Sequence, residues 1–213
     1  MTKNAIVTAV SSSTMHVLDG GSLLHRVKWP KTGTYGEVML SYVCCVQKHY
    51  GATAMVVFDG YSNGASPKDP EHERRAKKMA AEVQVNESKL VFGCQESFLA
   101  NPANKSQFIT LLGNQLSAAG HPVQYAAGDA DTLIVSSALQ IARQQKPVTV
   151  VAEDTDVLLL PVHHLEASMA DIFMLLMART RNAVAKLFSI HKEQICVLKI
   201  GKNCQLLNLL VSV

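Results

Sequence analysis

Six aspartates stand where the sequence predicts strand ends or helix starts: Asp19, Asp59, Asp129, Asp131, Asp154 and Asp156. Functional groups gather at the carboxyl ends of the strands in parallel α/β sheets, so these side chains are expected to converge although they are far apart in the chain. One aspartate after a strand is usually a turn or capping residue. The set is therefore more informative than any of its members.

The spacing of these aspartates points to a metal site. Asp129 and Asp131 are two residues apart, and Asp154 and Asp156 repeat that spacing next to Glu153. Collecting carboxylates is costly because of repulsion and desolvation, and a bound divalent cation removes that cost. All-oxygen ligands suit Mg²⁺ or Mn²⁺ rather than zinc, and no HExxH or paired Cys/His spacing competes. The residues therefore predict a magnesium or manganese site.

The elements that must position these aspartates alternate between two kinds. Short apolar runs predict strands at 15–18, 53–58, 123–126 and 148–152, and helical spacing predicts helices at 37–50, 104–119 and 128–145. This alternation is typical of an α/β fold with a mainly parallel sheet. Further helices are predicted across 70–83 and 170–186, and a further strand at 195–200.

Composition excludes several classes of protein. The 213 residues are 48% hydrophobic and 17% charged, which argues against disorder. A net charge of +3 does not by itself predict a nucleic-acid binder, since clustering matters more than the total. Five cysteines without a CxxC predict neither a disulfide framework nor a zinc knuckle. With no signal-peptide pattern and no apolar run of about 20 residues, a soluble intracellular protein of the nucleus or cytoplasm, away from membranes, is expected.

Four segments resemble the PIN-like nucleases of the flap-endonuclease type. They are VLDGGSLLHRV around Asp19, VVFDGYSNGASPKD around Asp59, GDADTLIV around Asp129, and VVAEDTDVLLL around Asp154, and they occur in family order. The likeness spans about residues 13–160, and FDGYSNGASPKD with HERR is most similar to a transposon-associated animal branch of that family. Each segment alone is a weak signal, whereas four in order make a strong one.

The resemblance implies a single PIN-like domain over residues 1–213, a three-layer α/β fold with a central, mostly parallel sheet flanked by helices. It also implies a nuclease that hydrolyses phosphodiester bonds of DNA or RNA with two divalent ions, one of which lowers the pKa of the attacking water. Carried over by position, Asp19 and Asp59 hold one metal with help from Asp129 or Asp131. Asp154 and Asp156 hold the second.

The sequence departs from the family pattern in two ways. The family more often has glutamate in the third segment, where this chain has Asp129 and Asp131. It also has a further aspartate beyond the fourth segment, whereas here Asp171 alone follows Asp156, in an apolar setting. Residues 161–213 are therefore interpreted as truncated or atypical. The alternative function is a catalytically inactive nucleic-acid-binding or interaction module from a degenerate mobile-element protein.

A basic cluster follows the second segment. Lys68, Arg74, Arg75 and Lys78 are predicted to contact phosphates of a nucleic acid, with DNA favoured over RNA. The competing interpretation is a solvated helix face in which these bases pair with Glu71 and Glu73. No GxSxG, GxGxxG or P-loop pattern supports a serine hydrolase or a nucleotide-cofactor enzyme.

Overall fold

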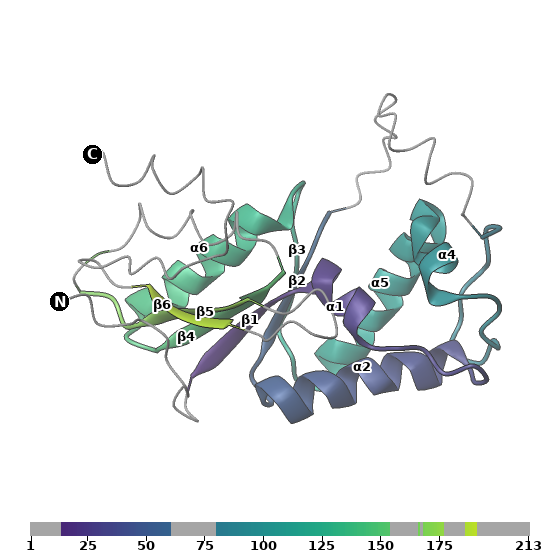
Figure 1. Cartoon of the computed structure of the whole chain (residues 1–213), viewed down its shortest axis with the longest axis horizontal. Helices are drawn as coiled ribbons and strands as arrows, with labels where there is room; N and C mark the ends of the chain where they lie inside the picture. Colours follow the sequence, from purple (N-terminus) through teal and green to yellow (C-terminus); the bar gives the residue numbers. More distant parts are fainter. Residues whose placement is uncertain (1–13, 61–79, 154–165, 167, 177–185, 191–213) are drawn as a thin grey trace. The chain divides into compact units, whose positions relative to one another are not determined.

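The computed structural model describes residues 14–60, 80–153, 166, 168–176 and 186–190 (Figure 1). The chain divides into two compact units. One is Met15–Ile134, and the other combines Met1–Thr14 with Val135–Val213. The described residues contribute three strands of an α/β fold to each unit.

Three parallel strands form the sheet of the unit Met15–Ile134. They are β1 (Met15–Asp19), β2 (Met55–Phe58) and β3 (Val123–Tyr125), in the order β3-β2-β1. The register pairs Asp19 with Val57 and Phe58 with Tyr125, so the carboxyl ends of all three strands lie at one edge. Val17, Val56 and Val57 are fully buried, which explains why the strands are near-continuous apolar runs.

Among the described residues, four helices lie wholly in this unit, and their ends follow from local sequence signals. They are α1 (Gly20–Arg26), α2 (Tyr35–Tyr50), α4 (Gln95–Ala100) and α5 (Pro102–Ala118). Thr34 and Glu37 form a capping box at the start of α2. Asn101 caps α5, and Pro102 occupies its first turn, where a missing N–H costs nothing. A fifth helix, α6 (Ala130–Arg143), begins in this unit.

An aromatic cluster with one polar centre packs α1, α2, α4 and α5 together. Trp29 lies 5.0 Å from both Phe98 and Phe108, measured between ring centroids. At its centre the buried Tyr42 hydroxyl donates to the Leu24 carbonyl at 2.6 Å and accepts from Trp29 Nε1 at 2.9 Å. Burial raises the pKa of Tyr42, so its hydroxyl remains protonated and able to donate.

The side chain of Gln95 completes this polar centre at the end of α1. Its Nε2 donates to the carbonyls of Leu24 at 2.8 Å and Val27 at 2.9 Å, and it approaches the Tyr42 hydroxyl at 3.3 Å. The last carbonyls of a helix have no partner within the helix itself. Gln95 therefore ends α1 and fixes it against α4.

The other unit contains β4 (Val148–Ala152), β5 (Ile172–Leu176) and β6 (Lys186–Ile190). β5 pairs in parallel with β4 and antiparallel with β6. All five residues of β4 are buried, as expected for a strand covered on both faces. The α/β class and the mostly parallel strands predicted from the sequence are confirmed, and β4 matches its predicted bounds.

One predicted helix needs correction, and another lies mostly outside the described residues. The helix predicted across 170–186 is wrong where the structure describes it, because Ile172–Leu176 is strand β5, with Ile172 and Met174 buried at alternate positions. Pairing with β4 and β6 outweighs the helix propensity of this apolar segment. The helix predicted across 70–83 lies mostly outside the described residues, and its last part, 80–83, is not helical. The strand predicted at 195–200 also lies outside them.

No helix in the described part of the chain is long and apolar enough to cross a membrane.

Replacing Tyr42 with phenylalanine tests the polar centre. Tyr42→Phe leaves Trp29 Nε1 without its buried acceptor, so the free energy of unfolding should fall by about 1–3 kcal/mol. Urea denaturation of the full chain measures this change. Tyr125→Phe is the matched control, because Tyr125 is 50% exposed, and its effect should stay within about 0.5 kcal/mol. Equal losses in the two variants would contradict the role given to Tyr42.

Candidate functional site

Asp19 ends β1 and caps α1. Its Oδ1 accepts a hydrogen bond from the Gly21 N–H at 2.8 Å, and its backbone is extended, with φ −68° and ψ 111°. This is the usual geometry of an aspartate at a helix N-cap. The predicted site residue is therefore held at the carboxyl edge of the sheet by the helix that follows it.

Asp59 follows β2 at the same edge and binds the start of α6. Its Oδ1 accepts from the Ala130 N–H at the start of α6, at 3.1 Å. Its Oδ2 lies 3.6 Å from the point where a Cβ on Gly21 would stand, and Asp19 Oδ1 lies 3.2 Å from that same point. The two carboxylates thus border one position, and their oxygens are no farther apart than the sum of these distances.

Asp129 and Asp131 lie where α6 begins. Asp129 Oδ1 accepts from the Asp131 N–H at 3.2 Å, in the manner of an N-cap. Because Ala130 between them donates to Asp59, the start of α6 is tied to the end of β2. The N-terminal end of a helix carries partial positive charge, which favours the carboxylates gathered there.

Gly60 allows this tie because no larger residue fits. A Cβ at Gly60 would lie 1.7 Å from the Ala126 carbonyl oxygen, which is far inside any permitted contact. The Gly60 N–H donates to the Gly128 carbonyl at 3.2 Å, and the Ala126 N–H donates to the Phe58 carbonyl at 2.9 Å. The chain after β2 and the chain after β3 therefore run in contact up to the acidic residues.

The structure brings some of the predicted site residues together and does not test the others. Asp19 and Asp59 face a common point, and Asp129 and Asp131 flank the residue that binds Asp59. Within the described ranges, no group of three or more His, Cys, Asp or Glu side chains is arranged to hold a metal ion. Asp154 and Asp156 lie outside these ranges, as do the four predicted phosphate contacts, Lys68, Arg74, Arg75 and Lys78.

The donor chemistry of the described carboxylates fits a hard divalent cation. A carboxylate offers about four acceptor positions, so one bond from a backbone N–H leaves oxygen lone pairs for a metal. Asp59 directs Oδ1 to Ala130 and Oδ2 toward Gly21, beside Asp19. Such oxygens are the ligands that Mg²⁺ and Mn²⁺ take, usually alongside waters.

The sequence does not predict which backbone groups hold the carboxylates of the site. The N–H groups of Gly21 and Ala130 hold the carboxylates, and Gly60 permits the close approach of the two chains. The available signal was the glycine directly after both Asp19 and Asp59, since such glycines often mark close backbone approach. That signal does not reveal which chain approaches.

No protein-family model and no curated protein matches the chain at a significant level. The resemblance to PIN-like nucleases therefore rests on the four sequence segments and stays a prediction.

Two glycines provide a matched test of the close approach. Gly60→Ala should destabilise the protein by about 1–3 kcal/mol or more, because its methyl group overlaps a backbone carbonyl that cannot rotate away. Gly128→Ala places the same methyl group where nothing lies within 4 Å, and should change stability far less. Urea midpoints of the two variants give the comparison. A Gly60→Ala protein as stable as wild type would contradict the geometry described for the site.

Proposed function

We propose that the chain is a nuclease that hydrolyses phosphodiester bonds of DNA or RNA and depends on Mg²⁺ or Mn²⁺. One observation supports this most: carboxylates from two neighbouring parallel strands, Asp19 and Asp59, border a single point. Asp59 also binds the start of α6, where Asp129 and Asp131 lie. Asp19 and Asp59 thus lie beside each other, and Asp129 and Asp131 flank the residue that binds Asp59.

The role of each residue follows from its contacts. Bound at this edge, a divalent cation would lower the pKa of an attacking water and offset charge on the phosphate. The hydrogen bond from Ala130 fixes how the Asp59 carboxylate is turned, and the N-cap bond from Gly21 fixes that of Asp19. Asp129 and Asp131 add negative charge at the rim. Asp154 and Asp156 are assigned as further metal ligands by the resemblance alone.

The closeness of the Asp19 and Asp59 carboxylates is informative because their mutual repulsion costs free energy. Two neighbouring carboxylates repel each other, and a protein gains nothing from this arrangement unless a cation or a set of donors compensates. Two helix starts supply part of that compensation, through the N–H groups of Gly21 and Ala130. A divalent cation would supply the rest. A nucleic acid is the substrate class that the four segments and the predicted basic residues Lys68, Arg74, Arg75 and Lys78 favour.

Asp59→Asn is the sharpest substitution for testing this activity. Asparagine keeps an oxygen that can accept from Ala130, so the fold should be retained while the charge is lost. Cleavage of labelled single-stranded, flap and duplex DNA in Mn²⁺ should be detectable for wild type. It should fall in Asp59→Asn by more than the roughly 10- to 100-fold typical of losing an outer-shell partner of a metal site.

Glu166→Gln is the matched control, because it removes an exposed carboxylate whose hydrogen bond, 3.1 Å long, is to Arg143. It should cleave as wild type does. Equal residual cleavage in wild type and Asp59→Asn would reject the proposal. Binding of the DNA without cleavage in wild type would support the inactive binding module instead.

A further inference from the structure

An irregular segment of the unit Met15–Ile134 is fixed by side-chain amides rather than by regular secondary structure. Residues 80–92, here called the strap, contain no helix and a single isolated bridge. The fully buried Asn104 of α5 donates to the Ala81 carbonyl at 2.9 Å and accepts from the Val83 N–H at 2.8 Å. Gln107 accepts from the Val85 N–H at 3.1 Å. The strap therefore has a defined course along α5.

The end of the strap is joined to the start of α2. The Val91 N–H donates to the Gly33 carbonyl and the Tyr35 N–H to the Lys89 carbonyl, both at 2.9 Å, around a bridge between Thr34 and Leu90. Beyond this pairing, Phe92 is 76% exposed, the largest value among the large hydrophobic side chains that the structure describes. Leu90, two residues earlier, is 58% exposed. An exposed aromatic ring thus stands on a supported backbone.

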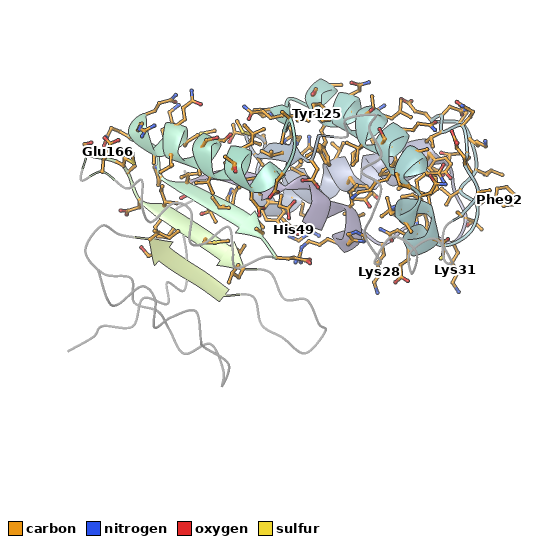
Figure 2. The ribbon with its side chains drawn as sticks, turned by 90° about the horizontal axis from the view of Figure 1, so that it is seen from above. Lys28, Lys31, His49, Phe92, Tyr125 and Glu166 are labelled. Atoms are coloured by element: carbon orange, nitrogen blue, oxygen red, sulfur yellow. The ribbon has the colours of Figure 1, made fainter. Side chains whose placement is uncertain are left out.

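Two lysines accompany this ring. Lys28 and Lys31 are exposed on either side of Trp29, which is anchored by the Tyr42 hydroxyl and the surrounding rings. Lys31 is two residues before Gly33, the residue bonded to Val91, so the pairing brings its segment next to Phe92. Figure 2 shows Lys28 and Lys31 projecting from the same side of this end of the unit, with Phe92 at its tip.

Acidic side chains in the same segments are partly engaged. The Glu37 carboxylate accepts from the Thr34 N–H at 2.7 Å at the start of α2, and Glu87 accepts from the Gln115 amide at 2.8 Å. Glu82 in the strap and Glu96 just after it are also exposed. The attraction of this surface for an anion therefore depends on where the lysines lie rather than on the net charge of the surface. An exposed ring at the same end of the unit as exposed cations can bind bases by stacking and phosphates by charge.

α1 connects this surface with the acidic edge. Asp19 caps the first turn of α1, and Lys28 follows its last turn by two residues. Seven helical residues span about 10 Å, so a few nucleotides of a nucleic-acid strand could reach from the carboxylates to the end of α1, which Lys28 follows.

We infer that Phe92, Lys28 and Lys31 form a binding surface for an unpaired segment of nucleic acid. One base stacks on the Phe92 ring, and the two lysines contact phosphates of the nucleotides that lead from Phe92 toward α1. The inference rests on the proposed function, because the bound nucleic acid runs along α1 to the acidic edge.

Binding of a fluorescent oligothymidylate of about 12 nucleotides tests this surface, with the full chain in EDTA so that metal and cleavage play no part. Anisotropy should show binding by wild type that is tighter than binding of a duplex of equal length. Phe92→Ala should weaken it by at least about fivefold, the effect of losing one stacked base. Phe92→Tyr keeps a ring and should bind within about twofold of wild type.

The salt dependence of oligonucleotide binding and a control substitution at another exposed residue complete the test. Lys28→Ala and Lys31→Ala should each reduce the magnitude of the slope of log affinity against log salt by about 0.7. Leu40→Ala is the control, because Leu40 is 57% exposed on α2 and has no part in the proposed surface. Thermal unfolding verifies that each variant is folded.

The outcomes separate this inference from the proposed function. No binding by wild type, or equal binding by wild type and Phe92→Ala, would overturn the inference and leave the surface to a protein partner. Metal-dependent cleavage together with that result would leave the nuclease proposal intact. Phe92-dependent binding without any cleavage would support the inference and count against the nuclease.

Discussion

The hydrogen bond from the Ala130 N–H to Asp59 is the constraint on which the acidic edge depends. It joins the end of β2 to the start of α6, and it leaves the second oxygen of Asp59 facing Gly21, beside Asp19. The bond forms because Gly60 lets the chain pass against Ala126 at a distance that excludes any side chain. The Ala130 N–H at the start of α6 stabilises the Asp59 carboxylate and fixes the direction in which Oδ1 points.

Side-chain hydrogen bonds also fix the C-terminal end of α1. Tyr42 and Gln95 bind the last carbonyls of this short helix, Trp29 donates to the Tyr42 hydroxyl, and these contacts pack the helix against α2 and α4. A helix of seven residues is too short to be stable alone, so its position depends on these tertiary contacts. The same contacts fix Trp29 and hence the segment that carries Lys28 and Lys31 (Figure 2). One aromatic cluster thus supports both the acidic edge and the proposed nucleic-acid-binding surface.

Much of this arrangement could be predicted from the sequence, for physical reasons that also explain the failures. Asp19, Asp59 and Asp129 follow strong signals, namely buried apolar runs and a glycine before a helical period, so their places at strand ends and a helix start were predictable. The strand Ile172–Leu176 was mistaken for part of a helix, because a short apolar run has no clear period and pairing with β4 and β6 decides its conformation. The strap was unpredictable for a related reason: amides on α5, about 20 residues away in sequence, satisfy its backbone.

The central claim is that Asp59 and its neighbours bind a divalent cation. Isothermal titration of Mn²⁺ into the full chain, wild type beside Asp59→Asn and Glu166→Gln, tests it without any assumption about a substrate. The account predicts saturable binding by wild type and Glu166→Gln, and at least about tenfold weaker binding by Asp59→Asn, whose fold the retained acceptor for Ala130 should preserve. Identical Mn²⁺ affinities for wild type and a folded Asp59→Asn would contradict it.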